Sequence, residues 1–291
     1  MQWYPGHMAK ARDLLRKNIK LVDLILEVID ARIPISSSNP EINALKGQKP
    51  KLLILNKMDL ASPAATARWQ KWYKQQNCET IALDAISGQG LRNVIAAAHR
   101  LVQPTMKKLR DKGRRSRPAR LMVVGIPNVG KSSLLNRIVG RKRAATGARP
   151  GITRGKQWIK VGGELELLDM PGILWPRIED PSIGLKLAAT GALPLESVPV
   201  EEVAHWLGAL LVKKNPLQLK ERYGFSSSPK DPNQMLDDIG IKRGMLLPGG
   251  VSDRDRVARL FLREFQNGQL GRITLELPPE GNYNGFCTHV P

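Results

Sequence analysis

The sequence predicts an α/β fold, in which a mostly parallel sheet carries helices on both faces and a smaller helical domain follows. Short aliphatic runs of strand length alternate with helical periodicity through the first part of the chain, and this alternation is typical of a parallel sheet. After about residue 180 the strand-like runs give way to amphipathic helical patterns. A chain of 291 residues is long enough for two such domains.

The expected strands are separated by turn residues or by helical segments. Their ranges are 21–29, 51–55, 80–83, 121–124, 157–161 and 164–168. A helix is expected over 132–139, directly after the fourth strand. The segment 107–120 is predicted to be an exposed connector, because its like charges repel and Gly113 and Pro118 interrupt it.

Apolar residues at helical spacing predict two helices beyond the sheet. One carries Val200, Val203, Leu207, Leu210 and Leu211, and the other carries Val257, Leu260, Phe261 and Phe265. Ser252 and Asp255 have the spacing of a capping box for the second helix, and Gly268 is placed to end it. One more strand is expected at 272–277. These boundaries predict a basic helical arm at 1–20, the sheet domain at 21–178, a helical domain at 179–277 and a disordered tail at 278–291.

The chain is strongly basic, with 46 Lys and Arg against 26 Asp and Glu and a formal net charge of +20. Most of the excess lies in 101–120 and 141–160, which flank one glycine-rich loop. Such an excess of positive charge favours a polyanionic partner. No apolar run approaches the roughly 20 residues that a membrane-spanning helix needs, and no leader-like segment opens the chain. We therefore expect a cytoplasmic protein that binds nucleic acid rather than a membrane.

A phosphate-binding loop is predicted at 125–132, where the sequence is G-x-x-x-x-G-K-S between a strand and a helix. Its glycines let backbone amides face a phosphate chain, and the helix start adds partial positive charge. Lys131 would reach the terminal phosphates and Ser132 would offer an oxygen to Mg²⁺. A chance match is the alternative, but the order of strand, loop and helix disfavours it. The residues assigned to nucleotide binding here are Asn128, Val129, Gly130, Lys131, Ser132 and Ser133.

The base is predicted to be guanine. The sequence N-K-x-D, formed by Asn56, Lys57, Met58 and Asp59, ends a buried strand. An Asp there can accept from the ring N–H and the exocyclic amine of guanine, whereas adenine lacks that donor pair. Asp84 and Ala85 end the next strand, where the Ala85 amide can contact the guanine oxygen. ATP is the weaker alternative for the nucleotide. The alternative for the N-K-x-D segment is that it forms only a solvated turn after the strand.

Three further residues predict a metal-assisted phosphate site. Asp169 ends a strand in the sequence D-x-P-G, where it can hold Mg²⁺ through water and the amide of Gly172 can sense the γ-phosphate. Thr153 lies between the phosphate loop and that strand, where it can complete the metal shell when GTP is bound.

The order of these motifs is unusual, because the base-reading segment precedes the phosphate loop. The sequence therefore resembles the circularly permuted GTPases. Within them it resembles the ribosome biogenesis GTPase A family, through the segments 3–10, 30–34, 125–133, 249–250 and 271–274. Asp84 departs from the pattern, since GTPases more often have Ser there. The permutation attaches the γ-phosphate sensor to the helical domain, so we expect the GTP state to set the orientation of that domain.

The resemblance implies hydrolysis of GTP to GDP and phosphate, slow alone and stimulated by the ribosomal particle. The implied role is late assembly of the large (50S) subunit, with binding to ribosomal RNA or precursor particles in the GTP state and release on hydrolysis. GTP or GDP, Mg²⁺ and K⁺ are the implied ligands, and a monomer is expected when the protein is free. A GTPase that serves tRNA modification and a non-hydrolysing GTP-dependent scaffold are the alternatives.

Catalysis is expected to lack the usual water-orienting Gln, because Ile173 follows the D-x-P-G segment. The resemblance implies that His7 takes this role; the alternative is that His7 only packs or caps a helix. Lys131 and Thr153 are the other two residues assigned to catalysis, through the phosphates and the metal. Resemblance to potassium-stimulated GTPases implies that Asn128 helps to hold K⁺, although a loop Asn often bonds only its own backbone.

Two basic surfaces are candidates for RNA contact. Arg141, Lys142 and Arg143 flank the expected switch, and Arg256, Arg259 and Arg263 share one face of the last helix. A solubilising face is the alternative for the second group. Aromatic residues do not interleave with these charges, which favours structured RNA over single strands.

Overall fold

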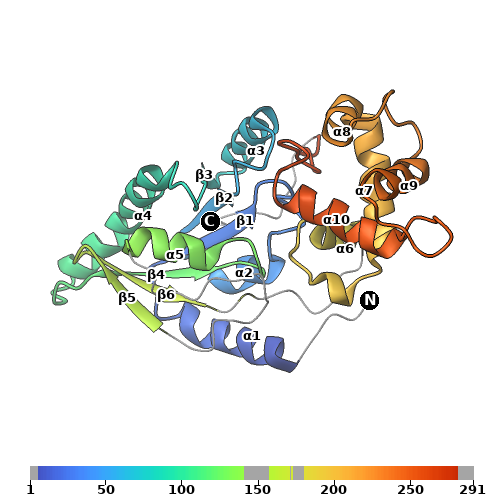
Figure 1. The fold of residues 1–291 in the computed structure, drawn as a ribbon. Helices are drawn as coiled ribbons and strands as arrows, with labels where there is room; N and C mark the ends of the chain where they lie inside the picture. Colours follow the sequence, from blue (N-terminus) through green and yellow to red (C-terminus); the bar gives the residue numbers. More distant parts are fainter. Residues whose placement is uncertain (1–5, 141–156, 171, 173–179, 281–291) are drawn as a thin grey trace. The chain divides into compact units, whose positions relative to one another are not determined.

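The computed structural model shown in Figure 1 describes residues 6–140, 157–170, 172 and 180–280. The chain divides into two compact units. The first, here called the sheet unit, consists of Met1–Glu179 and Thr274–Pro291, and the second, the helical unit, is Asp180–Ile273. The helical unit is therefore an insertion near the end of the sheet unit rather than its C-terminal continuation.

The sheet has six strands in the order β3-β2-β1-β4-β6-β5. Their bounds are β1 (Leu24–Asp30), β2 (Lys51–Asn56), β3 (Glu79–Ala82), β4 (Ala119–Val124), β5 (Gln157–Val161) and β6 (Leu165–Asp169). All neighbouring pairs are parallel except β5 and β6, which are antiparallel. The predicted mostly parallel sheet is confirmed. Because parallel strands point the same way, the loops after β2, β4 and β6 meet at one end of the sheet.

Helices cover both faces of this sheet (Figure 1). Their bounds are α1 (Gly6–Ile19), α2 (Pro40–Lys46), α3 (Pro63–Gln75), α4 (Leu91–Asp111) and α5 (Lys131–Val139). Buried residues of α1 and α2 pack with Ile25 and Met122 in one cluster, while Trp69 and Tyr73 of α3 pack with Leu53 in another. The helix α4 contacts β1 and β2, and α5 contacts β5 and β6. Among the described residues, no helix is both long and apolar enough to cross a bilayer.

The predicted connector over 107–120 is wrong at both of its ends. The helix α4 continues to Asp111, and β4 begins at Ala119. Repulsion between the like charges of 107–111 does not stop the helix, because their side chains are exposed and water screens them. The connector is therefore 112–118.

The strand predicted at 272–277 is also wrong. No strand forms there; residues 274–280 have no regular secondary structure and belong to the sheet unit, and they are here called the return segment. The amide of Leu275 donates to the carbonyl of Arg32 at 2.8 Å, and the indole of Trp69 donates to the carbonyl of Glu276 at 3.0 Å. The adjacent residues Leu275 and Glu276 are both buried, without the alternation of a half-buried strand.

The helical unit is built around one central helix. Its elements are α6 (Pro181–Ala189), the short 3₁₀ helix η1 (Leu195–Ser197), α7 (Val200–Lys214), α8 (Pro216–Tyr223), α9 (Pro232–Lys242) and α10 (Arg254–Gln266). The helix α7 contacts α6, α8, α9 and α10, and its predicted apolar face is buried except for Leu210, which is half-buried. The predicted capping box of α10 is wrong, because Asp253 rather than Ser252 accepts from the amide of Arg256 at 3.1 Å. Gly268 follows the end of α10, as predicted.

Candidate nucleotide-binding site

The phosphate loop joins β4 to α5, which begins at Lys131. Gly130 has a φ of +96°, a left-handed conformation that disfavours other residues. A Cβ atom there would also lie 2.2 Å from the amide nitrogen of Asn56. This glycine therefore permits both the sharp turn into α5 and a close approach of the base-reading segment. Asn128 adopts a φ of 60°, which Asn tolerates better than most residues.

Lys131 is positioned to receive a negatively charged ligand. Its side chain is buried, and Nζ donates to the carbonyl of Ile126 at 2.7 Å. Burial lowers the pKa of Lys131 to about 8, while the nearby Asp169 acts in the opposite direction. A phosphate chain at the start of α5 would supply the negative charge that stabilises the ammonium form.

Asn56 joins the two halves of the site. Its side-chain amide donates to the carbonyl of Val129 at 2.7 Å, and its oxygen accepts from the amide of Ala85 at 3.0 Å. All three groups are buried. The phosphate loop, the end of β2 and the segment after β3 are therefore connected through one side chain. Asn56 thus joins residues that lie 29 and 73 positions away from it in the chain into a single site.

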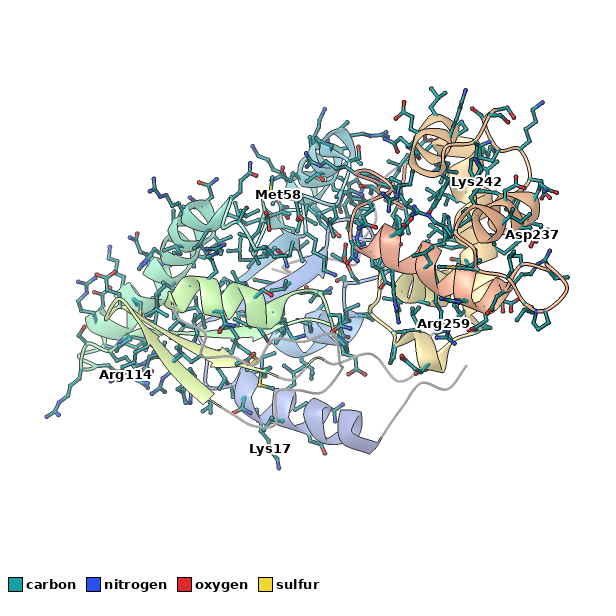
Figure 2. All side chains as sticks on the ribbon, viewed as in Figure 1. Lys17, Met58, Arg114, Asp237, Lys242 and Arg259 are labelled. Atoms are coloured by element: carbon teal, nitrogen blue, oxygen red, sulfur yellow. The ribbon has the colours of Figure 1, made fainter. Side chains whose placement is uncertain are left out.

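The remainder of the N-K-x-D motif is held by a buried ionic network. Lys57 has a φ of 60°, and its Nζ lies 3.0 Å from a carboxylate oxygen of Asp30. The Arg32 guanidinium donates to both carboxylate oxygens of Asp30, at 2.9 and 2.7 Å. Although burial acts to raise the pKa of Asp30, the charges of Arg32 and Lys57 hold it far below its usual range. Asp59 is exposed, so its carboxylate is available to a nucleotide base. The neighbouring Met58 is labelled in Figure 2 and marks the place of this motif.

Asp84 stabilises the turn after β3. Its carboxylate accepts from the amides of Ile86 at 2.8 Å and Ser87 at 3.2 Å. Burial acts to raise the pKa of Asp84, but hydrogen bonds from Ser87 and Ile86 outweigh it and lower the pKa. The amide of Ala85 already donates to Asn56, so a guanine contact would share that amide. The assignment of both residues to the base stays a prediction.

The γ-phosphate side of the site is closely packed. Asp169 is buried at the end of β6, and Ser132 lies in the first turn of α5. A Cβ atom on Gly172 would lie 2.9 Å from the backbone of Pro127 and 3.0 Å from Nζ of Lys131. Only glycine allows the chain to approach the phosphate loop this closely at position 172. The donor set of a hydroxyl, a carboxylate and a buried lysine fits a phosphate with Mg²⁺.

Several predicted residues cannot be placed in this site. His7 lies in α1, but its side chain is outside the described part of the structure. Thr153, Ile173 and the predicted RNA contacts Arg141, Lys142 and Arg143 are also outside it. The residues Arg256, Arg259 and Arg263 lie on α10; the first and last are exposed, and Arg259 pairs with Asp255 at 2.7 Å.

Sequence reasoning missed the supporting network of Asp30 and Arg32. Arg32 pairs with Asp30, and Asp30 in turn pairs with Lys57, which follows a different strand. Ser36, further along the same loop, bonds the carboxylate of Glu276. The available signal was a charged pair directly after a run of aliphatic residues, because Asp and Arg are almost never fully buried unless they are paired.

Comparison with known proteins agrees with this geometry. A family model described as "50S ribosome-binding GTPase" matches residues 120–204. "Ribosome biogenesis GTPase A" of Priestia megaterium is 45% identical over 281 residues, covering 96% of this chain and 98% of the relative. The protein of that name from Thermotoga maritima is 32% identical over 280 residues, covering 96% and 95%. "Mitochondrial ribosome-associated GTPase 1" of Xenopus tropicalis is 36% identical over 294 residues, covering 94% of each chain.

Solved structures give the same result. The GDP-bound and GNP-bound structures of YlqF from Thermotoga maritima match with a TM-score of 0.63 and 28% identity, covering 92% of this chain and 99% and 98% of theirs. The match extends over both the sheet unit and the helical unit in sequence. With the curated relatives above 30% identity over nearly the full length, these results show that the chain belongs to the ribosome biogenesis GTPase A family.

Proposed function

We propose that this chain binds GTP and hydrolyses it while bound to a precursor of the large ribosomal subunit. The observation that carries the nucleotide part is the bridge at Asn56, which holds the phosphate loop and the base-reading loop together at one end of the sheet. GTP is favoured over ATP because Asp59 is exposed beside that bridge, where it can accept two hydrogen bonds from guanine. The order of the motifs supports a circularly permuted GTPase.

Each residue of the site has a defined task in this proposal. Lys131 neutralises charge on the terminal phosphates, and the amides at the start of α5 orient them. Ser132, Asp169 and Thr153 would hold Mg²⁺, which stabilises charge that develops on the phosphate oxygens. Asn128 would contribute to a K⁺ site. The amide of Gly172 would report the γ-phosphate to the segment that leads into the helical unit.

The attacking water needs another group to orient it, because Ile173 occupies the usual glutamine position. We assign this task to His7, whose imidazole can hold or accept a proton near neutral pH. Turnover of GTP by His7→Ala should fall strongly in the presence of the ribosomal precursor, while its affinity for GDP stays unchanged. Unchanged stimulated turnover would remove His7 from the mechanism. Equal turnover in KCl and NaCl would show that K⁺ has no part in the hydrolysis.

The proposed partner rests on the relatives, whose names connect them with ribosomes, and on the basic charge of this chain. Sedimentation of a cell lysate with a non-hydrolysable GTP analogue tests it. The protein should travel with particles of the large subunit or its precursors, and GDP should release it. Association with tRNA instead would favour the role in RNA modification. A precursor that binds without stimulating turnover would favour the non-hydrolysing scaffold.

A further inference from the structure

A basic groove lies at the opposite end of the sheet unit from the nucleotide site. It has a volume of about 1010 Å³ and lies among the second half of α4, the connector 112–118, the start of β4 and the turn between β5 and β6. The phosphate loop follows the other end of β4, so roughly 20 Å of strand separates the two. In Figure 2, Arg114 beside the groove and Met58 of the base-reading motif lie at opposite ends of this unit.

The charge of the groove is almost entirely positive. Six of its lining residues are Lys or Arg, whereas Glu164 is its one acidic residue. Two of the arginines serve the structure, since Arg100 pairs with Glu79 and Arg117 pairs with Asp23. The four others form no ion pair with any described residue: Lys107, Arg110, Arg114 and Arg115, here called the groove cluster. All four side chains are exposed to solvent.

The backbone that carries the groove cluster is fixed. The end of α4 is closed by hydrogen bonds from the amide of Gly113 to the carbonyl of Arg110 at 2.8 Å and from the amide of Arg114 to the carbonyl of Leu109 at 3.1 Å. The far end of the connector is held by the Arg117 guanidinium, which donates to both oxygens of Asp23 at 2.8 and 2.9 Å. A ligand would therefore meet preorganised charges, which lowers the entropic cost of binding.

A purely stabilising role explains only part of this cluster. Basic residues in the last turn of a helix interact favourably with its dipole, which accounts for Arg110. Arg114 and Arg115 lie beyond the end of the helix and still line the same concave surface as Lys107. These four exposed charges repel one another weakly, because water and salt screen them, and an external anion that binds among them would lower this repulsion further.

The chemistry of the groove favours the backbone of structured RNA. No Phe, Tyr or Trp lines it, so single-stranded bases would have no surface on which to stack. A folded RNA instead presents closely spaced phosphates to which Lys and Arg bind without reading the sequence. We propose that the groove cluster is a second RNA-binding surface that engages a duplex region in both the GDP and the GTP state. This second surface rests on the proposed ribosomal function. It differs from the predicted RNA contact of Arg141, Lys142 and Arg143, which flank the expected switch, because it does not depend on the bound nucleotide.

Independence follows from the position of the groove. Every residue of the groove cluster lies at the amino end of the parallel strands, whereas the nucleotide-sensing residues lie at their carboxyl end. The strands between them are buried and hydrogen-bonded along their length, so they do not rearrange when a loop at the far end changes. This surface would keep the protein on RNA while the other contacts respond to GTP.

The test reverses three of these charges in the full-length protein, with the substitutions Arg110→Glu, Arg114→Glu and Arg115→Glu. The matched control carries Arg68→Glu, Lys71→Glu and Lys74→Glu on α3, which makes the same change of charge at exposed positions. Binding of a short blunt-ended RNA duplex is measured with GDP and with a non-hydrolysable GTP analogue over a range of KCl concentrations. The groove variant should lose roughly tenfold or more in affinity, equally in both states, and its salt slope should fall by about three relative to the unsubstituted protein.

The outcomes separate the possibilities. The proposal would be overturned by any of three results: the groove variant binds the RNA duplex with unchanged affinity, the α3 control loses as much affinity, or the loss appears in only one nucleotide state. Loss of binding to phosphatidylserine vesicles with no loss for RNA would assign the surface to membranes instead. If the triple variant does not fold, as judged by GDP affinity, Arg114→Ala with Arg115→Ala should show a smaller loss of the same kind. Failure of the ribosomal precursor to stimulate turnover by the unsubstituted protein would reject the proposed function without altering the duplex result.

Discussion

At the scale of single residues, the buried Lys131 should couple nucleotide binding to the uptake of a proton. Burial lowers its pKa to about 8, and bound phosphate should raise the pKa again because it supplies negative charge. Below the lower pKa the lysine is protonated with or without nucleotide, so no proton is exchanged. Between the two pKa values it gains a proton on binding, and affinity should fall by up to about tenfold per pH unit as pH rises.

Calorimetry of GDP binding at about pH 7 and about pH 9, each in buffers of different ionisation heat, measures this uptake directly. Proton uptake should be near zero at the lower pH and approach one at the higher pH. A binding heat that is the same in every buffer at the alkaline pH would show that Lys131 is not the coupled group.

Asn56 has a larger structural role than a contact with the base. Asn56→Ala leaves the carbonyl of Val129 and the amide of Ala85 without their partner in a buried place. The free energy of unfolding should fall by about 2 to 4 kcal/mol, and GDP affinity should fall more than tenfold because the two loops separate. Urea unfolding and GDP titration measure the two effects. Asn93→Ala, at an exposed position of α4, is the control and should change neither quantity.

The sequence predicted these motifs well but not the contacts between them. The residue types of Gly130, Lys131 and Asp59 carry their chemistry in a short spacing, so local pattern is sufficient to find them. The bond from Asn56 to Val129 joins positions 73 residues apart, and the support of Lys57 by Asp30 crosses between strands. Such pairs depend on strand order, which a local pattern does not contain.

At the scale of elements, the carboxylate of Glu276 makes several of the hydrogen bonds that hold the return segment to the rest of the sheet unit. Glu276 is buried, and it accepts from the amides of Ile35 at 2.8 Å and Ser36 at 3.2 Å and from the Ser36 hydroxyl. Glu276→Ala should therefore lower the free energy of unfolding of this unit by about 2 to 4 kcal/mol, since three donors lose a charged acceptor. Urea unfolding followed by tryptophan fluorescence measures it, because Trp69 bonds the same segment.

Glu280→Ala is the control for this variant, because Glu280 is exposed on the same segment. It should leave the unfolding midpoint in place. Equal stability of the two variants would mean that the carboxylate of Glu276 does not fasten the segment.

The elements themselves differ in how far the sequence predicts them. The aliphatic runs of β1, β2, β4 and β6 were found because a buried parallel strand has an unmistakable composition. The last turns of α4 were missed because their charges suggested a loop. The return segment was taken for a strand, but its partners are loops and an indole rather than a sheet edge. Tertiary contacts decided both cases.

At the scale of the whole molecule, the helical unit has two attachments to the sheet unit. The first attachment leads from Gly172, a residue that approaches the phosphate loop, to the start of the helical unit at Asp180. The second is at the end of the helical unit, where Thr274 begins the return segment. The hydroxyl of Thr274 accepts from the amide of Ser62, close in sequence to the N-K-x-D motif. The sequence predicted the first attachment from the order of the motifs. It did not predict the second, because the helical domain was expected to continue to residue 277.

Two attachments of different kind predict how the helical unit responds to nucleotide. The attachment near Gly172 is expected to change with the γ-phosphate, whereas the one at Glu276 is held by buried hydrogen bonds. GTP should therefore turn the helical unit about the fixed end. Small-angle scattering with GDP and with a non-hydrolysable GTP analogue should give different curves. Glu276→Ala, which frees the fixed end, should broaden the distance distribution in both states, and Glu280→Ala should not. Superimposable curves for the unsubstituted protein in the two states would contradict this coupling, because the γ-phosphate would then have no mechanical effect on the helical unit.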